Sequence, residues 1–245
     1  QRQGVDGGGR LPVLLVENKV LDLDGRAAPP PPPRPAGPPW RIGWYGAIRC
    51  RRSLGLLADL AARRPDLIRV EIRGRPALTA FDDFEAQVTG ARALRFAGPY
   101  TADDLPALYG DVHFAWAIDW FEAGANSAWL LPNRVYEGGR HGAVPLALRS
   151  VETGRWLAAR GLGVLMDDPA GELEAMLETM TPDRYAELAA RAAAAPVGHF
   201  AAGPDDCRAL VRSLARTQER DAQGGVSIPE TEFDAIARGL PCSDT

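Results

Sequence analysis

The sequence predicts an α/β fold, in which a doubly wound, mostly parallel sheet carries helices on both faces. Short apolar runs of strand length alternate about six times with segments of helical periodicity, a pattern typical of such sheets. The chain has 245 residues, of which 46% are hydrophobic and 24% charged. This composition is ordinary for a globular protein, and the chain is long enough to bury a core.

The expected strands are short apolar segments that Gly, Pro or polar residues follow. They are residues 41–46, 67–74, 94–97, 112–117, 145–148 and 163–166.

The expected helices are defined by apolar spacing and by their end signals. Leu54, Leu57 and Leu60 recur at helical spacing before Pro65 stops the first helix. Thr101 with Asp104 resembles a capping box that opens a helix running through Tyr109. The first helix is expected at 53–64. The other helices are expected at 81–88, 132–140, 154–160, 170–180, 182–194 and 205–217.

The ends of the chain differ from its middle, and we expect three parts, 1–39, 40–217 and 218–245. The first part holds a short apolar strand at 11–16 and a proline run at 29–33, which should form an extended connector. The last part has few apolar residues and should be loosely attached. Because the chain starts at Gln1 and carries no signal segment there, we expect an excerpt of a longer protein.

Charge and hydropathy exclude several functional classes. The 28 basic and 32 acidic residues give a net charge of −4, whereas a nucleic-acid binder needs a basic surplus. No apolar run approaches the roughly 18 residues of a membrane-spanning helix. The three cysteines and three histidines lack disulfide or metal-ligand spacing. We therefore predict that the protein has no metal site and that it resides in the reducing cytoplasm.

The first candidate site is the turn after the strand at 41–46. In open parallel sheets, ligands bind beyond the carboxyl ends of the strands. Gly46 permits close backbone approach, and Arg49, Arg51 and Arg52 crowd the start of the next helix, which favours a bound diphosphate. The alternative is that these arginines are a solvated helix start. The turn is neither a GxGxxG nor a Walker loop.

The second candidate site follows the strand at 112–117. Pro132 suits a first helical turn and Gly142 ends that helix, so Glu137 lies on a short helix at the mouth of the sheet. A carboxylate there can accept two hydrogen bonds from a vicinal diol such as a ribose. The alternative is that Glu137 pairs with Arg134 or Arg140 on the helix surface.

The third candidate site is the loop after the strand at 145–148. Thr153 could cap the following helix while N–H groups near Gly154 bind phosphate oxygens. A plain helix cap is the alternative.

The order of these motifs resembles a known family. The Gly46 loop with Arg52, the stretch RFAGPY at 95–100, and the element PNRVYE-x4-G-x-x-P look like the C-terminal domain of GT-B glycosyltransferases, a Rossmann-like domain. The chain is most similar to family 4 of the retaining enzymes and to bacterial exopolysaccharide enzymes of the succinoglycan type, which carry a similar NSxWLLPNRxYEGG stretch. The match covers residues 40–217.

The resemblance assigns roles to individual residues. It implies that Glu137 is the second glutamate of the family's E-x7-E signature and binds the nucleotide ribose, and that Arg52 contacts the diphosphate. Trp129 stands where the first glutamate is expected, so we expect a longer loop to carry Glu122 or Asp119 to the donor sugar as the catalytic group. Asn133 and Arg134 are expected as further donor-site contacts.

The resemblance also implies an activity. It predicts the donor-binding half of a metal-independent, retaining transferase without a cofactor, which moves a sugar from a nucleotide diphosphate sugar to a polysaccharide or lipid-linked oligosaccharide acceptor. Residues 1–39 would then be a remnant of the acceptor domain plus a linker, and the missing domain would associate with the inner face of the plasma membrane from the cytoplasm. The alternatives are a nonhydrolysing nucleotide-sugar epimerase of the same fold, and a non-catalytic nucleotide-binding or partner-docking domain.

Overall fold

The computed structural model describes residues 16–23 and 35–224, and side chains as far as residue 215. Most of the expected strand at 11–16, the proline run at 29–33 and the tail beyond Gly224 lie outside the described residues. The chain divides into two units, and residues 16–203 form the unit that contains the sheet. In the other unit, the described residues form one helix, α9 (Pro204–Gly224), which continues past the expected end at residue 217.

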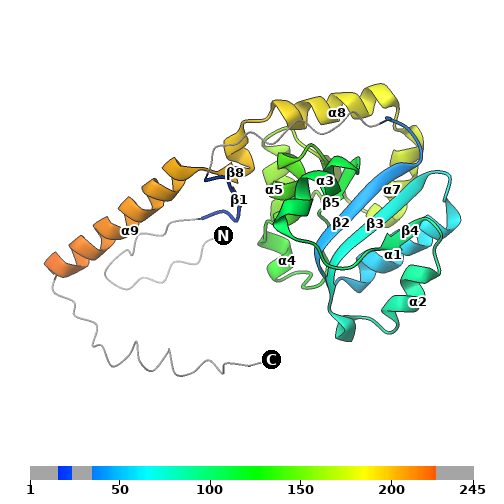
Figure 1. The fold of residues 1–245 in the computed structure, drawn as a ribbon, viewed down its shortest axis with the longest axis horizontal. Coiled ribbons are helices and arrows are strands. Elements are labelled where there is room, and N and C mark those ends of the chain that lie inside the picture. The colour runs from blue at the N-terminus through cyan, green and yellow to red at the C-terminus, as the bar shows by residue number, and fades with distance from the viewer. Residues whose placement is uncertain (1–15, 24–34, 225–245) are drawn as a thin grey trace. The chain divides into compact units, whose positions relative to one another are not determined.

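The main sheet has six strands, and every pair of neighbours is parallel. In spatial order they are β4 (Leu94–Phe96), β3 (Ile68–Pro76), β2 (Trp40–Ile48), β5 (Phe114–Trp116), β6 (Val144–Leu148) and β7 (Val164–Met166). The strand order therefore changes direction between β2 and β5, which are the two central strands in Figure 1. This topology confirms the α/β fold predicted from the alternation, and it locates the expected ligand crevice at the carboxyl ends of β2 and β5.

Helices cover both faces of the sheet. On one face, side chains of α1 (Arg51–Arg63), α2 (Phe84–Thr89), α7 (Pro169–Thr179) and α8 (Pro182–Ala194) share a single apolar cluster with the strands. On the other face lie α3 (Leu105–Gly110), α5 (Asn133–Arg140) and α6 (Glu152–Ala158). The remaining short elements are η1 (Leu78–Ala80), η2 (Ala102–Asp104), α4 (Asn126–Trp129) and η3 (Val197–His199).

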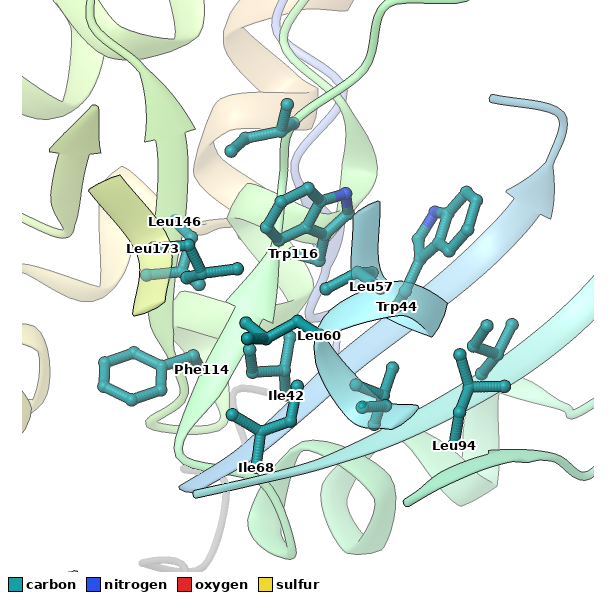
Figure 2. Close-up of a cluster of buried hydrophobic side chains, with 14 of the residues drawn as sticks. Ile42, Trp44, Leu57, Leu60, Ile68, Leu94, Phe114, Trp116, Leu146 and Leu173 are labelled. Atoms are coloured by element: carbon teal, nitrogen blue, oxygen red, sulfur yellow. The ribbon is translucent and has the colours of Figure 1, made fainter. Parts of the chain in front are cut away.

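The core depends on alternation along the central strands. Ile42 and Trp44 of β2 point toward α1, whereas Tyr45 packs with α3 on the opposite face. Figure 2 shows Ile42 and Trp44 gathered with Leu57 and Leu60 of α1. Most of β2 is buried because both of its faces are covered, which is why parallel strands read as near-continuous apolar runs.

A short segment before the sheet packs against α5 and α6. Its strand β1 (Val20–Leu21) pairs in parallel with β8 (Ala201–Ala202). The Trp156 indole N–H donates to Glu17 at 2.8 Å, and Asp22 pairs with Arg140 of α5. Two-residue strands carry no periodicity, so the sequence did not predict this pair. The expected division at residue 39 stays a prediction, although residues 16–23 and 35–39 lie in the same unit as the sheet.

Candidate functional site

Two glycines shape the carboxyl ends of β2 and β3. Gly46 and Gly74 are register partners, and both have positive φ, 108° and 136°. A Cβ on Gly74 would lie 1.8 Å from the carbonyl oxygen of Gly46, so only glycine fits there. A Cβ on Gly46 itself would meet no atom closer than the hydroxyl of Tyr100, at 3.9 Å. The backbone at Gly46 is therefore open toward Tyr100.

The loops after β2 and β5 are bound to each other at the start of α1. Cys50 caps this helix, and its sulfur accepts hydrogen bonds from the backbone N–H groups of Ser53 and Trp120 at 3.4 and 3.3 Å. The Ser53 hydroxyl accepts from the Trp116 indole at 3.0 Å and donates to the carbonyl of Ile118 at 3.4 Å. These buried contacts fix the arginine-bearing turn against the loop that carries Asp119.

The three arginines of that turn point in different directions. Arg49 lies 3.6 Å from Asp119 and over the ring of Phe121, and Arg52 lies over the ring of Trp120 with 4.3 Å to the centroid. Arg51 instead pairs with Asp82 at 2.6 Å, beside η1. Two of the three arginines predicted to bind the diphosphate therefore face the loop after β5.

Asp119 lies between two guanidinium groups. Its carboxylate is 3.6 Å from Arg49 and 3.9 Å from Arg134, and it also accepts the backbone N–H of Phe121 at 2.8 Å. Arg134 is buried, its Nε atom has no hydrogen-bond partner among the described residues, and burial lowers the pKa of its guanidinium. One long ion pair compensates this buried cation poorly, which is the electrostatic situation that an anionic ligand would relieve.

Glu137 faces α3 from the neighbouring turn of α5. Its Oε2 accepts a hydrogen bond from the hydroxyl of Tyr109 at 3.2 Å. Burial raises the pKa of the Glu137 carboxyl, against the opposing effects of Tyr109 and Arg134. The alternative of a surface ion pair is not what the structure shows, since Arg134 pairs with Asp119 and Arg140 with Asp22.

Thr153 does not cap its helix, which corrects that expectation. The N-cap of α6 is Val151, and the buried Thr153 hydroxyl donates to the carbonyl of Leu130 at 3.0 Å. Gly154 allows α6 to approach the end of β6, because a Cβ there would lie 2.0 Å from the carbonyl oxygen of Leu148. Both residues thus hold α6 in place, and their role toward a diphosphate stays a prediction.

The remaining predicted residues lie at the margin of this site. Glu122 is exposed, and its backbone N–H donates to Ser127 at 3.1 Å. Asn133, at the first turn of α5, accepts a hydrogen bond from Asn18. Their proposed contacts with the donor stay predictions.

The structure thus brings together six of the predicted residues, Gly46, Arg49, Arg52, Asp119, Arg134 and Glu137. Four aromatic residues that the sequence reasoning did not assign to the site lie among them, namely Tyr100, Tyr109, Trp120 and Phe121. Burial raises the pKa of Tyr100 to about 12, with Glu137 as a further cause. Trp120 and Phe121 form an aromatic pair three residues after the predicted strand at 112–117, and this pair was the available signal for them.

His141 should make the unliganded protein sensitive to acid. Burial, with a contribution from Arg140, lowers the pKa of this imidazole to about 4, from 6.5. Because the unfolded chain binds the proton more tightly, the free energy of unfolding should fall as pH drops from about 6.5 to about 4. Chemical denaturation across this range should show a shallower pH dependence in His141→Gln than in the parent. Equal slopes would contradict the prediction.

The described ranges, 16–23 and 35–224, hold neither a metal-binding cluster nor a membrane-spanning helix. No group of three or more His, Cys, Asp or Glu side chains there is placed to hold a metal ion. No helix in these ranges is both long and apolar enough to cross a membrane.

Comparisons with known proteins agree with the fold and the resemblance. No protein-family model matches the chain. The succinoglycan biosynthesis protein ExoL of Rhizobium meliloti (strain 1021) is 47% identical over 210 residues, which are 83% of this chain and 52% of ExoL. The chain therefore spans about half the length of this relative.

Solved structures agree with this relationship at the level of the fold. HepE of Anabaena, crystallised with UDP and glucose, matches with a TM-score of 0.54 and 18% identity over 74% of this chain and 48% of HepE. A HepE structure with UDP-glucose gives a TM-score of 0.53 at 16% identity. The chain is accordingly a relative of a succinoglycan biosynthesis protein, and its parallel α/β fold is similar to that of about half of HepE.

Proposed function

We propose that the chain is the donor-binding half of a glycosyltransferase of exopolysaccharide synthesis. It would transfer a sugar from a nucleotide diphosphate sugar to a polysaccharide or a lipid-linked oligosaccharide acceptor. The observation that carries this proposal is the buried, poorly compensated Arg134, which shares Asp119 with Arg49 at the switch point of the sheet. The relationship to a succinoglycan biosynthesis protein supports the acceptor class.

In the proposed mechanism, the arginines stabilise the diphosphate as it leaves the sugar. Charge develops on the bridging oxygen in the transition state, and preorganised cations in a partly dry site lower the energy of that charge. Arg49, Arg52 and Arg134 would supply this role without a divalent metal. Glu137 would bind the ribose hydroxyls, because a carboxylate accepts hydrogen bonds from both members of a vicinal diol.

The sugar itself would lie near the loop after β5. Asp119 already accepts one backbone hydrogen bond and lies between two arginines, so we assign it to orienting them. Glu122 is exposed, and we assign it the direct contact with the sugar. Retention at the anomeric carbon is part of the proposal, as is a cytoplasmic location at the inner face of the plasma membrane.

Nucleotide binding by Glu137→Ala tests the proposal. The chain should bind one of UDP, GDP and ADP in titration calorimetry. The substitution should weaken that binding by about 10- to 150-fold, since a hydrogen bond to a charged group contributes roughly 1.5–3 kcal/mol. The parent's failure to bind any of the three would overturn the proposal. Unchanged affinity in the variant would place the ribose elsewhere.

Two rival functions make different predictions for the full-length protein. An epimerase would convert the nucleotide sugar without any acceptor, whereas a transferase would consume it only with an acceptor. A non-catalytic nucleotide-binding domain would bind the nucleotide sugar and convert nothing, whereas a partner-docking domain would bind no nucleotide.

Arg52→Ala should separate phosphate recognition from base recognition. Arg52 is exposed and stacks on Trp120, so its guanidinium is held at the mouth of the site. The change should lower affinity for UDP far more than for uridine, because only UDP presents the anionic charge. Added salt should weaken UDP binding less in the variant than in the parent. Equal losses for uridine and UDP would show that Arg52 is structural.

A further inference from the structure

We propose that Tyr109 is the positioning residue for Glu137, holding its carboxylate so that the second oxygen is presented to the ligand. This inference rests on the proposed function, because it concerns the residue assigned to the ribose. The observation behind it is the hydrogen bond of 3.2 Å from the Tyr109 hydroxyl to Glu137 Oε2. No hydrogen bond to Oε1 occurs within the described part of the chain.

The ring of Tyr109 is held from several directions. It lies edge-on to Tyr45 with 4.9 Å between centroids and is stacked with His141 at 6.4 Å. Gly138 of α5 lies directly against it, since a Cβ there would be 3.4 Å from the ring atom Cε1. A fully buried ring with such neighbours has one orientation, so its hydroxyl is a fixed point.

The hydroxyl of Tyr109 is the donor in its hydrogen bond with Glu137. Burial raises its pKa well above 10, and the neighbouring Glu137 raises it further. The phenol therefore stays protonated at neutral pH and can donate to the carboxylate. A permanent donor on Oε2 leaves both lone pairs of Oε1 and one of Oε2 for a diol.

The groups around Glu137 act on its charge in opposite ways. Tyr109 from α3 and Arg134 from α5 favour the ionised carboxylate, whereas burial disfavours it. Tyr100, from the loop after β4, is the other titratable group close to it. Removing the Tyr109 hydroxyl takes away one of two favourable contributions, so the carboxyl should hold its proton to a higher pH.

Tyr109→Phe tests this role, and Tyr45→Phe is a matched control. Both tyrosines are buried in the same cluster, but the Tyr45 hydroxyl donates to the carbonyl of Leu108 at 3.1 Å, away from Glu137. Carbon-13 NMR of glutamate-labelled, unliganded protein should show a higher Glu137 pKa in Tyr109→Phe and an unchanged pKa in Tyr45→Phe. Equal shifts in the two variants would overturn the proposal.

UDP titration gives the second measurement. At neutral pH, Tyr109→Phe should weaken UDP binding by about 3- to 10-fold, and the acid limit of binding should move to higher pH. In a Glu137→Ala background the same change should have no further effect, because the acceptor is gone. Additive losses in the two backgrounds would contradict a positioning role.

The two proposals fail in different ways. If the parent binds none of UDP, GDP and ADP, the nucleotide site is wrong and this proposal is wrong with it. If the parent binds UDP while Tyr109→Phe changes neither the Glu137 pKa nor the affinity, only the positioning role is wrong. Should Tyr109→Phe not fold, the hydroxyl proton of Tyr109 remains observable by NMR. It should exchange faster in Glu137→Ala than in the parent, and equal exchange would overturn the proposal.

Discussion

Gly74→Ala should strongly destabilise the unliganded protein. The new Cβ would lie 1.8 Å from the carbonyl oxygen of Gly46, on a backbone whose φ is 136°. Strain at such a φ costs about 1–3 kcal/mol, and overpacking against backbone costs about 1–3 kcal/mol more. Because β2 is a central strand of the sheet and β3 is its neighbour, shifting either strand to make room for the methyl group would disturb the sheet. We expect a fall in Tm of about 5–20 °C.

The control for this prediction is Gly55→Ala in α1. A Cβ at Gly55 meets nothing within 4 Å, and the position is exposed on a helix. Alanine should therefore stabilise the protein by up to about 1 kcal/mol. Thermal unfolding of both variants by circular dichroism compares the two signs directly. A Gly74→Ala variant as stable as the parent would mean that the glycine pair at the ends of β2 and β3 is not in close contact.

Arg134→Met should abolish most nucleotide binding while leaving the unliganded protein equally stable or more stable. Among the described residues, the buried guanidinium has one ion pair of 3.9 Å and an Nε atom without a hydrogen-bond partner, so we expect its desolvation to exceed the attraction that it gains. Methionine fills similar space without that penalty. In the variant, a bound diphosphate has no buried cation to pair with. Removing one partner of such a buried ion pair typically costs about 2–5 kcal/mol of binding free energy or more, so UDP affinity should fall at least about 30-fold.

Arg140→Met is the matched control, since Arg140 stands on the same helix and its side chain is 9% exposed, as is that of Arg134. Arg140 forms a close ion pair with Asp22, and its loss would leave the Asp22 carboxylate without this cation. We expect this variant to lose stability, by about 3–5 kcal/mol, and to keep most of its UDP affinity. Calorimetry measures the UDP affinity of both variants, and chemical denaturation measures their free energies of unfolding. A large loss of stability in Arg134→Met with unchanged UDP binding would make Arg134 a structural residue.

Local pattern in the sequence determined the fold class and the site's neighbourhood. Hydrophobic runs such as the one around Ile42 and the leucines of α1 depend only on nearby residues, so each strand of the main sheet and each major helix was predictable close to its observed position. The rule for parallel sheets then selected the segments after β2 and β5, and the PNRVYE element carried the resemblance to GT-B glycosyltransferases.

Tertiary structure alone decided what each side chain at the site contacts. Nothing local distinguishes Arg51, which pairs with Asp82, from Arg52, which stacks on Trp120. The hydrogen bond from Tyr109 to Glu137 joins residues 28 apart in the chain. At the carboxyl ends of the strands, the direction of a side chain depends on how distant loops pack. The resulting burial then shifts the pKa of each ionisable side chain. For that reason, the sequence determined which segments meet at the crevice, and only the packing decided which of their charges remain poorly compensated and available to a ligand.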